Sequence, residues 1–196
     1  MSSVFLSYRR DDSSGYAGRL YDRLAQRLGR QRVFMDIDNI EPGEDFVEVI
    51  DTKLAGCRVM LVVVGPRWLA AADAQGRRRI DLPNDFHRLE IEGGLKHGVR
   101  VIPVLVGGAA MPDELSLPES LAPFARRNAS DISDKRFDFD VARLIDAVSK
   151  ALEPDAPAGA PIQHFLRTNR NTLLIIVAVW LALLALAAIA LWPWSG

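Results

Sequence analysis

The sequence predicts an α/β domain with a parallel β-sheet over residues 1–152, followed by one apolar helix near the C-terminal end. Three observations support this fold class. Short runs rich in Val, Ile and Leu alternate with segments of helical periodicity. The strand-like runs are apolar at successive positions, which is typical of strands buried on both faces. Residues 173–192 form a longer, unbroken apolar stretch.

Five segments are expected to form strands: VFLS (4–7), RVFMD (32–36), RVMLVVVG (58–65), VRVIPVLV (99–106) and a weaker fifth at 127–130. Helices are expected between and after them, at residues 16–28, 46–54, 86–97 and 141–152. This alternation predicts a parallel sheet with helices on both sides. Ligands of such sheets bind at the carboxyl ends of the strands, near the topological switch point.

Composition excludes several function classes. The 196 residues include 24 Lys and Arg against 25 Asp and Glu, and a net charge of -1 disfavours a nucleic-acid partner. A single cysteine, Cys57, excludes a disulfide framework and a Cys-rich zinc site. His87 and His97 have no matching carboxylate or thiol ligands, so we expect no metal. The predicted loops contain no phosphate-binding glycine motif.

The C-terminal segment predicts a membrane anchor. Residues 153–171 form a Pro/Ala-rich tether and juxtamembrane segment, and residues 172–192 are expected to form a single transmembrane helix. The apolar stretch is free of charge, Pro and Gly, and as a helix it would be ~30 Å long. Its Leu, Ile and Val residues contribute roughly -4 to -7 kcal/mol to insertion into a lipid bilayer.

The flanking charges predict the orientation of this helix. Arg167 and Arg170 precede the apolar stretch, whereas no Lys or Arg follows it. The positive-inside rule then places the N-terminal domain in the cytoplasm, as in a single-pass tail-anchored protein.

Four segments resemble the conserved boxes of TIR (Toll/interleukin-1 receptor homology) domains. They are VFLSYRRDDSSGYAGRLYDRL (4–24), VFMDIDNIEPGEDF (33–46), DFHRLEIEGGLKHGVRVIPVLV (85–106) and RFDFDVARLIDAV (136–148). The resemblance covers residues 1–152 and implies a flavodoxin-like fold with a five-stranded parallel sheet. TIR domains act either as scaffolds of signalling complexes or as NAD+ glycohydrolases, the latter often in bacterial and plant defence.

The resemblance implies that the chain is an NAD+ hydrolase that acts on self-association, as a defence or signalling effector. NAD+ is then the substrate and no separate cofactor is expected. Glu90 lies where the catalytic glutamate of the family falls, in the run DFHRLEI. On a helix, Phe86 lies one turn before Glu90 on the same face and is expected to form part of the floor for a flat ligand.

Further residues are candidates for binding the substrate. Arg9 and Arg10 follow the first strand and could contact the pyrophosphate or form surface ion pairs with neighbouring aspartates. Tyr8 could stack on the ligand or belong to the core. Trp68 could line the cleft or pack half-buried. Asp36, at the end of the second strand, could contact ribose hydroxyls or merely open the following loop.

The acidic loop after the second strand is the expected self-association loop. It comprises Glu41, Pro42, Gly43 and Glu44, of which the Pro-Gly pair predicts a turn. A basic surface near residues 77–79 is a hypothetical partner of this acidic loop, although a solvated loop is the favoured interpretation of the arginine run. No sensor domain is recognisable, so an unknown partner, ligand or crowding is expected to activate the protein.

Two other functions stay open at this point. A non-enzymatic TIR adaptor would recruit other TIR proteins to the membrane through the loop at Pro42. An enzyme of the same fold could instead hydrolyse nucleosides or transfer a base. The products of NAD+ cleavage, ADP-ribose or a cyclic form, are not distinguished by the sequence.

Overall fold

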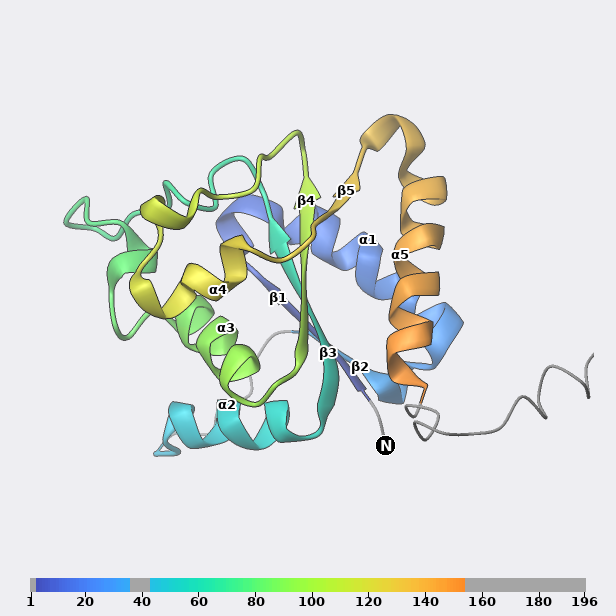
Figure 1. Ribbon diagram of the computed structural model, residues 1–196, viewed down its shortest axis with the longest axis horizontal. Helices are drawn as coiled ribbons and strands as arrows, with labels where there is room; N and C mark the ends of the chain where they lie inside the picture. Colours follow the sequence, from blue (N-terminus) through green and yellow to red (C-terminus); the bar gives the residue numbers. More distant parts are fainter. Residues whose placement is uncertain (1–2, 36–42, 154–196) are drawn as a thin grey trace, which may run out of the picture. The chain divides into compact units, whose positions relative to one another are not determined.

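Within the part of the chain that the structure describes, five parallel strands form one sheet in the order β2-β1-β3-β4-β5 (Figure 1). They are β1 (Ser3–Tyr8), β2 (Val33–Met35), β3 (Cys57–Val64), β4 (Arg100–Val106) and β5 (Ser130–Ile132). A computed structural model describes residues 3–35 and 43–153. The predicted α/β class and the five-stranded parallel sheet are confirmed.

Helices cover both faces of the sheet (Figure 1). The α-helices are α1 (Arg10–Leu28), α2 (Phe46–Ala55), α3 (Phe86–Lys96), α4 (Ala122–Ala125) and α5 (Phe137–Leu152). Single 3-10 turns lie at η1 (Arg30–Arg32), η2 (Arg79–Asp81), η3 (Glu114–Ser116), η4 (Glu119–Leu121) and η5 (Asp134–Arg136). Helices α1 and α5 pack on one face, whereas α2, α3 and α4 pack on the other.

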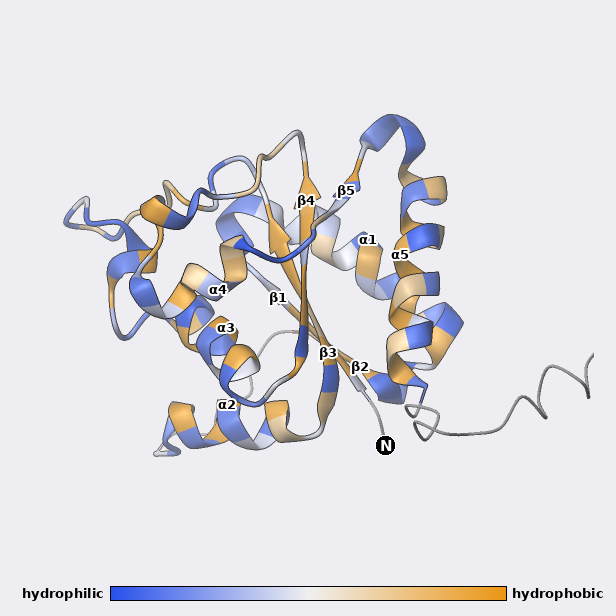
Figure 2. Cartoon of the chain, in the orientation of Figure 1, coloured by the Kyte–Doolittle hydropathy of each residue, from blue (hydrophilic) through white to orange (hydrophobic). Residues whose placement is uncertain are grey.

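Successive residues of β1 point to opposite faces and thereby join two cores. Val4 and Leu6 pack with α1 and α5, whereas Phe5 packs with α2 and α3. The strands are hydrophobic along most of their length, as Figure 2 shows at the centre of the domain. Continuous apolar runs in the sequence therefore correspond to strands buried on both sides.

The topological switch point lies between β1 and β3. From β1 the chain runs through α1 to β2 at one edge, then returns through α2 to β3 on the other side of β1. The crevice outside this point is where doubly wound sheets bind ligands. Because β1 ends at Tyr8, the residues around that strand end occupy this place in the fold.

Two expectations about elements need correction. The fifth strand begins at Ser130 rather than at residue 127, because pairing with β4 starts between Val104 and Ser130. Residues 127–129 instead connect α4 to the strand. Helix α4 was not expected, since four residues are too few to produce a periodic apolar pattern.

The chain divides into two units, Met1–Glu153 and Pro154–Gly196. The expected tether and transmembrane helix at 153–171 and 172–192 lie, apart from Glu153, outside the described residues. In the described ranges 3–35 and 43–153, no helix is both long and apolar enough to cross a bilayer.

Candidate functional site

Helix α3 begins beside the end of β1. Its N-cap is Asp85, whose side chain accepts a hydrogen bond from the backbone N–H of Arg88. This start places His87 and Glu90, one turn apart, against β1. Glu90 is only 8% exposed, so it is not a solvated surface carboxylate. Buried carboxylates require polar partners, and the end of β1 supplies one.

A chain of hydrogen bonds leads to the Glu90 carboxylate. Ser7 Oγ lies 2.5 Å from Glu90 Oε2 and 2.8 Å from His87 Nδ1. On the other side of the imidazole, Trp68 Nε1 lies 2.5 Å from His87 Nε2. The four side chains come from β1, from α3 and from the segment after β3. Their backbone positions lie up to 83 residues apart in the sequence.

The indole N–H of Trp68 decides which imidazole nitrogen carries the hydrogen. Because an indole nitrogen only donates, His87 Nε2 must accept, and the hydrogen of the neutral ring is then on Nδ1. The Nδ1–H donates to Ser7 Oγ, which leaves the Ser7 hydroxyl hydrogen for Glu90. Burial, and secondarily the charge of Arg9, lowers the pKa of His87 to about 3, so the ring is neutral at pH 7.

Ser7, His87 and Glu90 are therefore not a nucleophilic triad. A triad histidine must accept the serine proton, whereas His87 Nδ1 carries a hydrogen of its own. Ser7 is also only 1% exposed, so its hydroxyl is closed to a substrate. These contacts hold Glu90 in place and do not prepare an attack by Ser7.

Arg9 forms a buried ion pair. Its guanidinium lies 3.0 and 3.1 Å from the two carboxylate oxygens of Asp85, and the side chain has no exposed surface. It also lies over the Trp68 ring, 5.9 Å from the centroid. The expected ion pair with a neighbouring aspartate is thus replaced by a pair with Asp85. In this structure Arg9 presents no side-chain surface to a pyrophosphate.

Tyr8 and Trp68 belong to the two cores. Tyr8 packs on the side of the sheet covered by α1 and α5, opposite to Glu90. Trp68 is 1% exposed and stacks on Phe124, with 5.8 Å between the ring centroids. The alternative of a core role therefore fits Tyr8 better than ligand stacking. Trp68 contacts the site through His87 and does not form a cleft wall.

Two other expected ligand contacts lie at the surface. Phe86 is 49% exposed and lies one turn before Glu90 on α3. Arg10 is the exposed first residue of α1, directly after the strand end. Both positions border the carboxyl end of β1 and stay candidates for contacts with a substrate. Asp36 lies outside the described residues.

The expected self-association loop is described only in part. Glu41 and Pro42 lie outside the described residues, whereas Gly43 and Glu44 are exposed. Gly43 has a φ of +98°, which favours glycine and agrees with the predicted turn. Asp45 then caps α2, its carboxylate accepting from Val47 N at 2.8 Å.

The run of arginines at 77–79 does not form an uncompensated basic surface. Arg77 pairs with Asp73, Arg78 with Asp81 and Arg79 with Asp85, as the recorded ion pairs show. These arginines thus form ion pairs with carboxylates of the same domain. The hypothesis that they receive the acidic loop of another copy loses its electrostatic basis.

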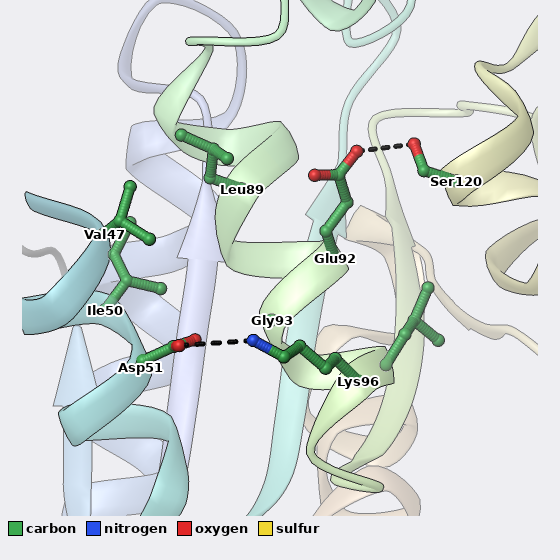
Figure 3. Close-up of a pocket in the computed structure, with 9 residues that line it drawn as sticks. Val47, Ile50, Asp51, Leu89, Glu92, Gly93, Lys96 and Ser120 are labelled. Atoms are coloured by element: carbon green, nitrogen blue, oxygen red, sulfur yellow. Dashed lines mark hydrogen bonds and ion pairs between the residues drawn. The ribbon is translucent and has the colours of Figure 1, made fainter.

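A separate hollow of about 400 Å³ lies between α2 and α3 (Figure 3). It is lined by Val47, Ile50, Asp51, Leu89, Glu92, Gly93, Leu95, Lys96 and Ser120. Lys96 Nζ lies 3.4 Å from Asp51 Oδ2, and Ser120 Oγ donates to Glu92 at 2.5 Å. Glu90 is not among the lining residues, so this hollow is distinct from the Ser7–Glu90 contact.

Gly93 allows the two helices to approach each other. A Cβ atom at this position would lie 2.8 Å from Leu54 Cδ1 of α2. Because α2 covers Gly93, this glycine forms no floor for a ligand beside Glu90. Beyond it, His97 Nε2 lies 3.1 Å from Asp51 Oδ1, and this hydrogen bond is the main cause that lowers the pKa of Asp51.

Across residues 3–35 and 43–153, no group of three His, Cys, Asp or Glu side chains is arranged to hold a metal ion.

The strand order defines a doubly wound α/β domain of the flavodoxin-like type, and comparison with known families gives its family. A model of the TIR domain family matches residues 4–145. The chain therefore belongs to the TIR domain family. No curated protein matches it significantly.

One solved structure supports the same fold at low identity, and two further structures show weaker similarity. The TIR domains of the activated Roq1 resistosome, which recognises the pathogen effector XopQ, share 16% identity, with 76% of this chain and 97% of that one covered and a TM-score of 0.51. The TIR domain of the Toll-related receptor TRR-2 from Hydra magnipapillata shares 20% identity. The match covers 73% of this chain and 97% of that one, with a TM-score of 0.47. A TIR-STING receptor from C. gigas in complex with 2',3'-cGAMP shares 20% identity. The match covers 89% of this chain and 46% of that one, with a TM-score of 0.47.

Proposed function

We propose that the chain is a membrane-anchored TIR NAD+ glycohydrolase and that Glu90 is its catalytic residue. The observation that carries the proposal is the position of this carboxylate. It is buried, hydrogen-bonded to Ser7 and located at the carboxyl end of β1, beside the topological switch point. Ligands of doubly wound sheets bind at this place. Membership of the TIR family, which includes NAD+-cleaving enzymes, adds to this support.

The reaction needs one carboxylate and no general acid. The bond between ribose C1' and the nicotinamide nitrogen breaks, and its electron pair stays on the nitrogen, which changes from a pyridinium to a neutral ring. The ribosyl centre becomes positively charged and resembles an oxocarbenium ion. Water then adds to C1' and releases a proton, which gives ADP-ribose. In a cyclising reaction, an internal nucleophile of the ADP-ribosyl group replaces water.

Glu90 would act by electrostatic stabilisation of the positive ribosyl centre. A unit charge pair about 4 Å apart at an effective dielectric constant of 20 interacts by ~4 kcal/mol, nearly a thousandfold in rate. A carboxylate that is already oriented and desolvated needs little reorganisation during the reaction. The hydrogen bond from Ser7 supplies that orientation.

Self-association at a membrane would control the reaction. An unregulated hydrolase would exhaust the NAD+ of its own cell. Activity that depends on clustering would preserve NAD+ as long as the protein is dispersed. An apolar anchor at 172–192 would confine the domains to a plane and raise their effective concentration. The acidic segment around Gly43 and Glu44 is exposed and stays the candidate contact between copies.

The test is mass spectrometry of NAD+ incubated with concentrated full-length protein. Wild type is expected to release nicotinamide, and Glu90→Gln to lose about 1000-fold in turnover. Glu119→Gln, an exposed glutamate on η4, is the matched control and is expected to behave as wild type. Equal turnover with and without Glu90, or no turnover by clustered wild type, would contradict the proposal and favour a TIR adaptor.

A further inference from the structure

We propose that Ser7 and His87 are positioning residues for Glu90. Through the Nδ1–H of His87 and the hydroxyl of Ser7, they hold the carboxylate in one orientation at the end of β1. This inference rests on the proposed function, because it assigns roles around the carboxylate proposed to be catalytic. Neither side chain touches a substrate in this account, and both act through Glu90.

The directions of the hydrogen bonds form one consistent series. Trp68 donates to His87, His87 donates to Ser7, and Ser7 donates to Glu90 Oε2. An ionised carboxylate only accepts, so it is the natural end of the series. Hydrogen bonds to an ionised acceptor are stronger than neutral ones, so the bond from Ser7 Oγ to Glu90 Oε2 would be the strongest of the series.

Burial makes this series effective. Ser7 is 1%, His87 4% and Glu90 8% exposed, so water competes little for their polar atoms. A low local dielectric strengthens satisfied hydrogen bonds and penalises broken ones. The carboxylate is therefore expected to keep its orientation while a substrate approaches its small exposed part.

The neutral state of the His87 ring affects Glu90 as much as the hydrogen on Nδ1 does. His87 Nδ1 lies 3.7 Å from Glu90 Oε2, close enough for an imidazolium to compensate the carboxylate charge. A neutral ring supplies a hydrogen-bond donor without that compensation. Besides Glu90, the charged groups that act on this ring are Arg9, Asp85, Arg79 and Asp12.

The first test does not depend on activity. The imidazole nitrogens of the full-length chain, labelled with 15N in histidine, are observed by long-range 1H–15N correlation, with His87 assigned from the signal lost in His87→Gln. We expect a neutral ring with its hydrogen on Nδ1 at pH 7. A ring protonated on Nε2, or an imidazolium at pH 7, would overturn the inference even if Glu90 proves catalytic.

The second test separates the two nitrogens. His87→Asn can place an amide N–H near the position of Nδ1 and keep the donor to Ser7. His87→Gln can place a carbonyl near Nε2 and keep only the acceptor for Trp68. We expect His87→Gln and Ser7→Ala to lower kcat on NAD+ by about 10- to 100-fold. Their KM should change less than the kcat, and His87→Asn should retain most of the wild-type kcat.

A pH profile distinguishes positioning from folding. Losing the donor series removes stabilisation of the ionised carboxylate, so the acidic limb of kcat should move to higher pH in His87→Gln and Ser7→Ala. His97→Gln, an exposed histidine at the end of α3, is the control and should leave the limb in place. Equal losses in His87→Asn and His87→Gln, with an unmoved limb, would show a structural role only. If Glu90→Gln keeps full turnover, the proposed function fails, whereas the NMR result still tests the hydrogen-bond series.

Discussion

His87 lies 4% exposed between Trp68 and Ser7, and its two ring nitrogens have opposite roles. Trp68 donates to one nitrogen, and the other donates to Ser7. Desolvation makes the charged form of the ring unfavourable, so the pKa of His87 falls to about 3. A residue type that often titrates near neutral pH is thus converted into a hydrogen-bond donor that is neutral at pH 7.

This burial predicts a pH-dependent stability. The unfolded His87 titrates at its ordinary pKa of 6.5, whereas the folded ring stays neutral down to about 3. Between these values only the unfolded chain binds the proton, so folding stability is full above pH 6.5 and falls as the pH is lowered towards 3. Relative to His87→Gln, wild type should lose up to about 1.4 kcal/mol per pH unit over this window. Urea unfolding of the full-length chain at several pH values measures the difference, and parallel curves for the two proteins would refute it.

Between elements, the junction of β1 with α3 depends on a buried charge pair. Arg9, which directly follows β1, pairs with Asp85, the N-cap residue of α3, and Arg79 Nε lies 3.2 Å from the same carboxylate. The same carboxylate caps the helix and anchors the arginine. The pair therefore fixes the angle and register at which α3 presents Glu90 to the strand.

Removing Arg9 should destabilise the domain strongly. Arg9→Ala leaves the 2%-exposed Asp85 side chain with a reduced set of partners, and breaking a buried pair typically costs about 3–5 kcal/mol. The matched control is Arg77→Ala, because Arg77 is 64% exposed in its pair with Asp73 and should cost less than about 1 kcal/mol. Chemical denaturation measures both values. Similar small losses in the two variants would show that Arg9 does not hold the junction.

At the scale of the whole molecule, the proposed function places the domain in water and the C-terminal apolar segment in the lipid bilayer. The described domain buries its apolar residues around the sheet, on both faces. The segment at 173–192 has an apolar side chain at every position. Such a sequence is most stable in hydrocarbon, where the backbone bonds to itself and the side chains meet lipid.

Charges introduced into this segment should release the protein from membranes. Two arginines, in the variant Leu181→Arg with Leu184→Arg, add about 5 to 7 kcal/mol to the cost of insertion. This cost is similar to the favourable energy expected from the apolar residues. Wild type should resist alkaline extraction of cell membranes, whereas the double variant should appear in the soluble fraction. Co-extraction of both proteins would contradict the anchor.

Much of the architecture could be predicted because it depends on local patterns. Apolar runs of four to eight residues and helical periodicity indicated the strands and the longer helices, and their alternation indicated a parallel sheet. The fifth strand was misplaced by about three residues because its few polar residues carry little of that pattern. Glu90 was selected by resemblance to the TIR boxes, a local signal of the same kind.

The partners of Glu90 could not be predicted from the sequence. Ser7, His87 and Trp68 lie far apart in the chain, and only the crossing of α3 over the end of β1 brings them together. The sequence alone determined which faces of strands and helices are apolar, because side-chain hydropathy and backbone periodicity act over a few residues. Tertiary structure decided which polar groups were taken out of water together. As a result, Arg9 forms a buried ion pair with Asp85, and His87 is a neutral hydrogen-bond donor to Ser7. Desolvation and hydrogen bonding depend on neighbours that meet only in the folded chain.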